Sequence, residues 1–208
     1  MHFTPCGDTL FTIQTLPEAH TMKSLVPLAD GVEEMEAVII LDVLRRAGWE
    51  VTAVALAGRE ITGSRGVRLL ADVAWPDVDP AAFNLIALPG GMAGVEAFLT
   101  FTPLLEAIRS FAAAGKPLAA LCAAPLVLQA AGVLDGRAAT AHPAVFDRLT
   151  SACRRTDRVV TDGVIITSRG PGTAFEFALA LVRQFDSPTK AENLARAMLV
   201  AIPKSDAP

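Results

Sequence analysis

The sequence has only three cysteines in 208 residues, and they form no C-x-x-C spacing. They are Cys6, Cys122 and Cys153. An odd and sparse set of this kind argues against a disulfide framework and against a structural zinc site. The scarcity of cysteine instead favours a reducing cytoplasm as the location of the protein.

Charge is also scarce, at 19% of the residues, with a net charge of −4. This balance provides no basic surface for specific nucleic-acid binding or for an anionic membrane. Long hydrophobic runs are missing too, because the best candidate, residues 112–133, is interrupted by Lys116, Pro117 and Gln129. A membrane span is therefore not expected, and the 52% of hydrophobic residues instead predicts a sheet covered by helices on both faces.

The first 21 residues differ from the rest, with scattered prolines and polar residues but no basic segment or signal-peptidase site. We expect Met22 to be the biological start, so that residues 1–21 are an extension that is not native. The alternative is a genuine N-terminal arm that packs on the surface. Residues 22–202 are predicted to form one domain, and residues 203–208 a flexible tail.

Strand and helix patterns alternate from residue 23 onward, which predicts an α/β fold with a doubly wound, mostly parallel sheet. The predicted strands are residues 24–29, 50–56, 84–88, 116–121, 137–141, 158–160 and 164–167, with a short strand pair at 65–71. The predicted helices are residues 33–47, 102–114, a segment after Cys122, 173–184 and 191–202.

Cys122 stands where a short buried strand passes into a helix, with Pro125 in the first helical turn. Free backbone N–H groups and the positive end of the helix dipole favour a thiolate there. We therefore expect Cys122 to be a nucleophile with a pKa well below the usual value of roughly 8.5. The alternative is a small buried core residue.

Other polar signals follow further strands, and the carboxyl ends of parallel strands form the ligand-binding edge of such sheets. Each signal also has an ordinary interpretation when taken alone. Glu33 and Glu34 suit the dipole of their helix, and a glycine pair such as Gly90–Gly91 suits a loop. His142 suits a satisfied loop histidine, and Arg169 a surface charge.

Taken in order, five motifs resemble the ThiJ/PfpI superfamily, in the branch that holds the human Parkinson-disease protein and its bacterial deglycase and chaperone relatives. The motifs are Ala-Asp-Gly-Val-Glu-Glu-Met-Glu (29–36), Leu-Pro-Gly-Gly (88–91), Leu-Cys-Ala-Ala-Pro (121–125), Ala-His-Pro (141–143) and Thr-Ser-Arg-Gly-Pro-Gly-Thr-Ala-Phe-Glu-Phe (167–177). The resemblance implies a flavodoxin-like homodimer with neither a metal nor an organic cofactor.

The resemblance also implies roles for individual residues. Cys122 takes the nucleophile elbow, Glu36 the acid that hydrogen-bonds the thiolate or its oxidised form, and His142 the pocket histidine. The expected substrate-binding residues are Gly90, Gly91, Ala123, Arg65 and Arg169. From chemistry alone, an acid buried beside a thiolate should have a raised pKa and could carry a proton during catalysis.

The resemblance, together with this thiol and acid, implies a cofactor-independent enzyme that acts on 2-oxoaldehydes. The expected reactions are glyoxalase III-type conversion of methylglyoxal to lactate, or removal of early glycation adducts. The alternative is an oxidative-stress sensor or chaperone switched by oxidation of Cys122, and an inactive relative is a weaker third interpretation. Protease activity is not expected, because Ala123 stands where the protease branch has histidine. Amidotransferase activity is not expected either, because the chain has no H-x-E pair.

Overall fold

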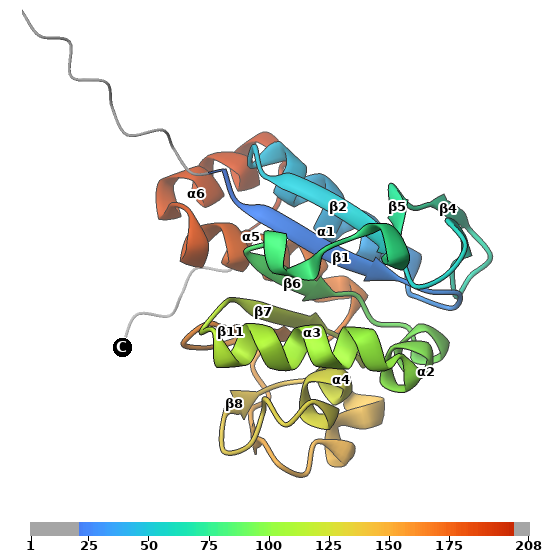
Figure 1. Cartoon of the computed structure of the whole chain (residues 1–208). Helices are drawn as coiled ribbons and strands as arrows, with labels where there is room; N and C mark the ends of the chain where they lie inside the picture. Colours follow the sequence, from blue (N-terminus) through green and yellow to red (C-terminus); the bar gives the residue numbers. More distant parts are fainter. Residues whose placement is uncertain (1–20, 202–208) are drawn as a thin grey trace, which may run out of the picture.

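The computed structural model describes residues 21–201, so the tail and almost all of the N-terminal extension lie outside the described residues (Figure 1). Its main sheet has seven strands in the order β10-β11-β7-β6-β1-β2-β5. These are β1 (Lys23–Leu28), β2 (Glu50–Ala55), β5 (Val73–Ala74), β6 (Leu85–Leu88), β7 (Leu118–Leu121), β10 (Val159–Asp162) and β11 (Ile165–Ser168). Neighbours in this sheet pair in parallel except β10 and β11. The strand order runs outward in both directions from β1 and β6, so the predicted doubly wound sheet is confirmed.

Helices cover both faces of this sheet. They are α1 (Glu34–Arg46), α2 (Met92–Thr100), α3 (Thr102–Ala113), α4 (Pro125–Ala130), α5 (Ala174–Phe185) and α6 (Pro188–Ala197). Figure 1 shows α2, α3 and α4 on one side and α1, α5 and α6 on the other. Every residue of β6 and β7 is buried, which explains why these strands are short, uniformly apolar runs in the sequence.

Helix α1 shows how local signals set its limits. The Glu33 side chain caps its start by accepting a hydrogen bond from the Glu36 backbone N–H. Arg45 and Arg46 stand in its last turn, beside the negative end of the helix dipole. Gly48, with a φ of 81°, then turns the chain toward β2. The predicted helix over residues 33–47 is therefore confirmed within one residue at each end.

Several elements differ from the sequence predictions. Helix α2 was missed, because Gly90, Gly91 and Gly94 indicate a loop, whereas Gly94 lets the helix pack against Val32. The predicted strand pair at 65–71 is a hairpin of β3 (Glu60–Thr62) and β4 (Arg68–Leu70), so Arg65 lies in its turn. The predicted strand at 137–141 shortens to β8 (Ala138–Ala139), which pairs with β9 (Cys153–Arg154). The last helix begins earlier than predicted, capped by the Ser187 side chain, and ends at Ala197.

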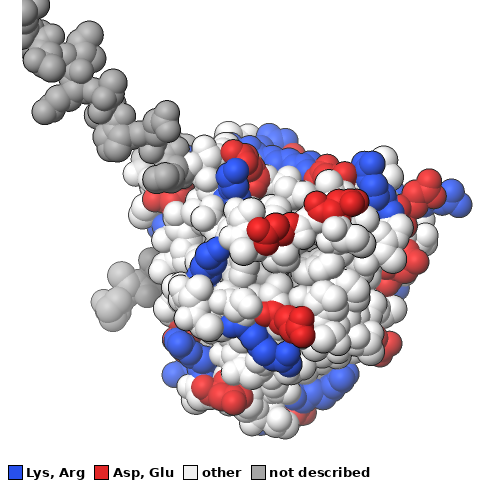
Figure 2. Space-filling model, in the orientation of Figure 1, with Lys and Arg blue, Asp and Glu red and all other residues white. Residues whose placement is uncertain are grey.

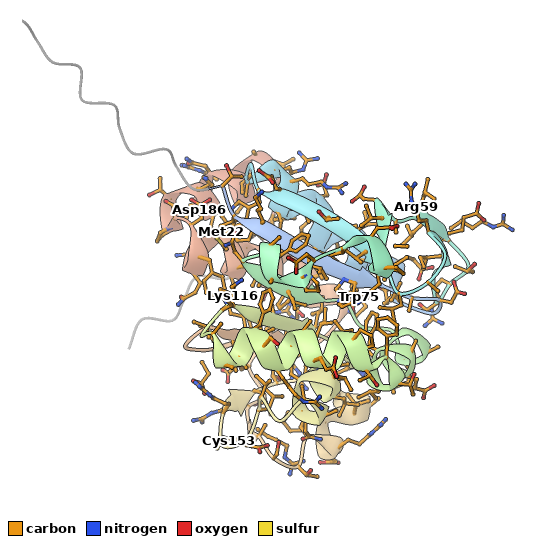
Figure 3. The ribbon with its side chains drawn as sticks, viewed as in Figure 1. Met22, Arg59, Trp75, Lys116, Cys153 and Asp186 are labelled. Carbon is orange, nitrogen blue, oxygen red and sulfur yellow. The ribbon has the colours of Figure 1, made fainter. Side chains whose placement is uncertain are left out.

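The surface carries charges of both signs. In Figure 2, lysines and arginines alternate with acidic residues around an uncharged central area. Cys153 is exposed beside β8, at the lower edge of the view in Figure 3. Within residues 21–201, every helix falls short of the length and apolarity that a membrane span needs.

Candidate active site

A cavity of about 900 Å³ opens at the carboxyl ends of the central strands. Cys122 follows β7, the loop before α1 follows β1, and the glycine pair follows β6. The predicted site residues that line the cavity are Cys122, His142, Gly91, Ala123 and Arg65. The fold therefore brings most of the expected site together at the edge where doubly wound sheets bind ligands.

The Cys122 backbone is held in an unusual conformation. Its φ is 64°, in the left-handed region that residues other than glycine rarely adopt. Two hydrogen bonds secure it: the Cys122 N–H donates to the Ser168 carbonyl at 2.9 Å, and the Cys122 carbonyl accepts from the His142 N–H at 2.8 Å. Strained backbone of this kind persists only where the surroundings over-determine it, and it concentrates at functional sites.

Glu36 lies against the cysteine, although 86 positions separate them in the chain. Its side chain is completely buried in the first turn of α1. The carboxyl Oε2 accepts a hydrogen bond from the Gly90 N–H at 2.7 Å, and the neighbouring Cys122 thiol influences the pKa of the carboxyl, whose Oε1 is buried without a hydrogen-bond partner among the described residues. A side chain at position 90 would place its Cβ 2.5 Å from the Cys122 Cβ and 2.8 Å from Glu36 Oε2. Gly90 is therefore the residue that lets the acid and the thiol meet.

Burial raises the pKa of Glu36 from its ordinary value of 4.5 to about 7. The charge of Glu33 raises it further, while the Gly90 N–H and the Cys122 thiol act in the opposite direction. The sequence-based expectation of a raised pKa at this acid is confirmed. A carboxyl of this kind holds or releases a proton near neutral pH, which is what general acid–base chemistry requires.

The expectation of a low pKa at Cys122 is wrong for the site in which Glu36 is ionised. Burial, then the negative charge of Glu36 and its hydrogen bond, raise the pKa of the thiol to about 12. The N–H groups of Gly91 and Ala123 lower it, as the helix argument anticipates, but they do not outweigh the carboxylate. Above pH 7 the pair therefore holds one proton, which these pKa values place on the sulfur, and the thiolate forms when that proton passes to Glu36.

His142 sits beside the cysteine at the start of a 3₁₀ turn, Pro143–Arg148. Its Nδ1 accepts a hydrogen bond from the Ala144 N–H at 3.2 Å. The neutral ring therefore carries its proton on Nε2. The side chain is half-buried and lines the cavity. The fold therefore fixes the position of the ring at the cavity, and the bond to Nδ1 selects its neutral tautomer.

The two arginines expected at the cavity mouth are separated. Arg65 is exposed in the turn between β3 and β4 and lines the cavity. Arg169 instead lines an adjoining hollow of about 310 Å³. Its guanidinium Nη1 donates to the Thr156 carbonyl at 2.9 Å. His142 borders both spaces, so Arg169 is a neighbour of the site rather than part of the wall around Cys122.

The sequence profile of the DJ-1/PfpI family matches residues 22–184. The chain belongs to the DJ-1/PfpI family. Curated relatives include DJ-1 homolog B of Arabidopsis thaliana, 46% identical over 182 residues, which are 86% of this chain and 42% of that protein. The dj-1beta protein of Drosophila melanogaster is 41% identical over 86% of this chain and 97% of its own length. The chain spans about half the length of the Arabidopsis relatives it matches.

Solved DJ-1 structures share the fold. The crystal structure of Drosophila melanogaster DJ-1beta superposes with a TM-score of 0.84 at 40% identity, over 88% of this chain and all of that one. A structure described as oxidised Toxoplasma gondii DJ-1 gives a TM-score of 0.85 at 38% identity, with the same coverage. The flavodoxin-like α/β architecture predicted from the sequence is confirmed.

Several residues lining this DJ-1/PfpI cavity were not singled out as site residues. They include Glu33, Ser64, Met92 and Arg148. Glu33 carries a signal that could have identified it, because an acid three positions before Glu36 is a helix-capping pattern. Arg148 carries none, since a tertiary fold brings the end of the Pro143–Arg148 turn to the cavity. Among residues 21–201, no cluster of three or more histidines, cysteines and acids could hold a metal ion.

Proposed function

We propose that this protein is a glutathione-independent glyoxalase, which converts 2-oxoaldehydes such as methylglyoxal to 2-hydroxy acids. The observation that carries the proposal is the partly buried Cys122 thiol on the cavity wall, with the fully buried Glu36 carboxyl beside it and a Glu36 pKa raised to about 7. A thiol supplies the nucleophile for an aldehyde, and an acid poised near pH 7 supplies the proton transfers that follow.

The reaction begins at the sulfur. The thiol proton passes to Glu36, and the Cys122 thiolate attacks the aldehyde carbon. Glu36 returns that proton to the former aldehyde oxygen, which gives a hemithioacetal and leaves Glu36 ionised. The N–H groups of Gly91 and Ala123 that face the sulfur help to stabilise its negative charge before the attack.

Glu36 then moves a proton between the two substrate carbons. The carboxylate removes the proton from the carbon bonded to sulfur, which produces an enediolate, and returns it to the neighbouring carbon. His142, with its proton on Nε2, donates a hydrogen bond to the oxygens of the enediolate. The product is a thioester, and water hydrolyses it to the 2-hydroxy acid and the free thiol. The overall reaction adds one water and needs no external oxidant or reductant.

A named relative supports this assignment. A Caenorhabditis elegans protein described as the glutathione-independent glyoxalase DJR-1.2 is 35% identical over 85% of this chain and 95% of its own length. Deglycation of early glyoxal adducts would use the same thiol and acid, and we propose it as a second substrate class of the same site.

The test is to incubate the protein with methylglyoxal without glutathione and to measure lactate. Cys122→Ser and Glu36→Gln should each abolish turnover. Cys153→Ser is the matched control, because Cys153 is an exposed cysteine that does not line the cavity, and this variant should keep the wild-type rate. Lactate formation that survives Cys122→Ser would refute the proposal. Lactate release compared between free aldehyde and a preformed adduct separates scavenging from deglycation.

Oxidative sensing is the second candidate function, and the similarity to an oxidised DJ-1 structure favours it. In this proposal one equivalent of a peroxide oxidises Cys122 to the sulfenate and a second oxidises it to the sulfinate, and protonated Glu36 donates a hydrogen bond to the new oxygens. Mass spectrometry after peroxide treatment should find two added oxygen atoms on Cys122 and fewer in Glu36→Gln. Assays of chaperone activity before and after this treatment test whether oxidation is the switch.

We also propose that the protein acts as a homodimer in the cytoplasm. Met35 and Val38 of α1 are 55% and 46% exposed, and Val67, Leu70 and Phe175 are further large apolar residues in contact with solvent. Exposed apolar side chains of this size favour burial against a partner, and a second copy supplies a self-complementary surface. Cys122 and Cys153 are both free thiols, which fits a reducing compartment.

A further inference from the structure

Glu34 is a buried acid that the proposed chemistry does not use. It stands in the first turn of α1, between the capping Glu33 and the catalytic Glu36, and it is only 7% exposed. Its carboxylate points away from the Cys122 pair and holds the turn of the β3–β4 hairpin. Glu34 accepts from the Ser64 hydroxyl at 3.0 Å, from the Arg65 N–H at 2.9 Å and 3.2 Å, and from the Val67 N–H at 3.4 Å.

The residues that Glu34 holds form part of the cavity wall. The hairpin turn, residues 63–67, includes Gly63, Ser64 and Arg65, all of which line the cavity that contains Cys122. Figure 1 shows the hairpin as a projection at the edge of the sheet, beyond the end of β1, and Figure 3 labels Arg59, which precedes β3 at the open end of the hairpin. Ile61 anchors β3 in the core, but residues 64–67 of the turn are exposed, so the position of the turn depends on the hydrogen bonds that join it to the rest of the molecule.

Those bonds lead to the same segment that carries Glu36. The Thr62 N–H donates to Asp30 Oδ1 at 2.7 Å, and the Gly31 N–H donates to the Thr62 carbonyl at 2.8 Å. The Ser64 N–H donates to the Val32 carbonyl at 2.8 Å. Residues 30–36 bind the hairpin and also carry Glu36. The same segment therefore fixes the position of the hairpin turn relative to Glu36 and Cys122.

Gly63 packs closely against the side chain of Glu34. A Cβ at position 63 would lie 2.7 Å from both the Cδ and the Oε2 of Glu34 and 2.9 Å from its Cβ. The backbone can therefore pass over the carboxylate only because position 63 has no side chain. Two residues that are far apart in the sequence thus depend on each other at this contact.

We propose that Glu34 is a positioning residue, which fixes the hairpin turn as the wall that narrows the Cys122 cavity and holds small substrates. Burial raises the pKa of Glu34, but its hydrogen bonds from the backbone and from Ser64 lower the pKa more, to below its usual 4.5. The carboxylate is therefore ionised at neutral pH and accepts all of these bonds. An amide in its place would have one acceptor oxygen and would turn N–H donors toward backbone N–H groups.

The first experiment measures the hairpin itself and needs no turnover. Trypsin needs an extended segment for cleavage, and Arg65 stands in a hydrogen-bonded turn, so we expect the cleavage rate after Arg65 to rise with the open population of the turn. Glu34→Gln should speed cleavage after Arg65 by about tenfold or more, as the loss of charge-assisted hydrogen bonds implies. Gly63→Ala, which attacks the same contact from the opposite side and leaves the charge intact, should do the same. Glu60→Gln on β3 and Gly58→Ala, whose Cβ would meet nothing within 4 Å, are the matched controls.

The second experiment measures KM and kcat for methylglyoxal, to test the turn as a wall of the cavity, and it rests on the proposed function. Glu34→Gln and Gly63→Ala should raise KM for methylglyoxal several-fold and leave kcat within about twofold, since the Glu36–Cys122 pair is untouched. A variant that lowers kcat at constant KM would overturn the positioning role. Faster cleavage after Arg65 with no change in KM would overturn the role of the turn in the site, and unchanged cleavage would overturn the whole inference.

A third measurement keeps the two proposals distinguishable. In a Cys6→Ser, Cys153→Ser background, a bulky maleimide should alkylate Cys122 several-fold faster in Glu34→Gln, while iodoacetamide reacts within about twofold of the parent rate, because the thiol itself is unchanged. If the wild-type protein turns over no 2-oxoaldehyde, the proposed function fails. The comparison of the two reagents then still tests whether Glu34 holds the turn as a wall of the cavity. If Glu34→Gln accelerated alkylation by both reagents equally, the positioning role of Glu34 would be overturned.

Discussion

Glu36→Gln should remove a pH-dependent loss of stability that the wild-type protein carries. The folded-state pKa of Glu36 is raised to about 7, above its ordinary value of 4.5. Between these values the folded state keeps a proton that the unfolded state has released. The free energy of unfolding therefore falls as the pH rises through this window. The stabilisation from the retained proton is fully present below pH 4.5 and is lost by the time the pH passes 7.

The size of the effect follows from the two pKa values. At 1.36 kcal/mol for each unit of pKa, the difference corresponds to about 3 kcal/mol. Glutamine keeps the shape of the side chain, and its carbonyl oxygen can still accept from the Gly90 N–H that now bonds Glu36 Oε2. It carries no charge at any pH. When the pH is raised from 4.5 to 8, the unfolding free energy of the variant should therefore increase by up to this amount relative to that of the wild-type protein.

Denaturant unfolding at pH 4.5 and pH 8 measures the change directly. The difference in unfolding free energy between Glu36→Gln and wild type is the quantity to compare. The same pair of measurements in a Cys122→Ala background removes the thiol but leaves the acid buried, so the effect should persist. Glu60→Gln, an exposed acid on β3, should show no such dependence. A difference that stays constant with pH would show that burial does not raise the pKa of Glu36, and the argument for its role in proton transfer would fail with it.

Three further predictions concern neighbouring features. Gly90→Ala should lower stability by about 1–3 kcal/mol through overpacking and abolish turnover, whereas Gly172→Ala, which meets nothing within 4 Å, should do neither in thermal unfolding and lactate assays. Cys122→Gly should be more stable than Cys122→Ala by up to about 1 kcal/mol in denaturant unfolding, because glycine adopts a φ of 64° without strain. Light scattering should give twice the chain mass of 21.8 kDa, and Val38→Asp should give a single chain mass. A wild-type mass of one chain would exclude the homodimer.

The sheet could be predicted from the sequence because its signals are local. The strands β1, β6 and β7 are short apolar runs bounded by turn residues, and α1 carries its own cap and charge pattern. Helix α2 could not be predicted, because its glycines are selected by close packing on Val32 rather than by helix propensity. The hairpin was misplaced for a related reason. Its first strand has only three residues and depends on bonds to Asp30 and Gly31, which lie thirty positions away.

The site also has features that the sequence predicts and features that it does not. The raised pKa of Glu36 follows from burial beside a thiol, and the resemblance supplied that neighbour. The helix argument predicts a lowered pKa for Cys122, whereas the pKa is raised, because the argument counts nearby backbone dipoles and neglects burial and the carboxylate that the fold places near the sulfur. Arg169 was placed at the cavity by its motif, but its guanidinium turns to the Thr156 carbonyl. Side-chain direction at the end of a strand depends on which acceptor the surrounding loops present.

Three acids within one turn of α1 have three different tasks, and their spacing explains how. Glu33 lies at the cap, so its side chain folds back to the Glu36 N–H. Glu34 and Glu36 are two positions apart, about 200° around a helix with 3.6 residues per turn, so their carboxylates diverge. One meets the hairpin turn and the other meets Cys122 and Gly90. Charge alone favours all three at a helix start, which is why composition cannot tell them apart. What separates them is the environment of each carboxyl: hydrogen bonds from backbone N–H groups and from Ser64 keep Glu34 ionised, whereas burial leaves Glu36 able to hold a proton.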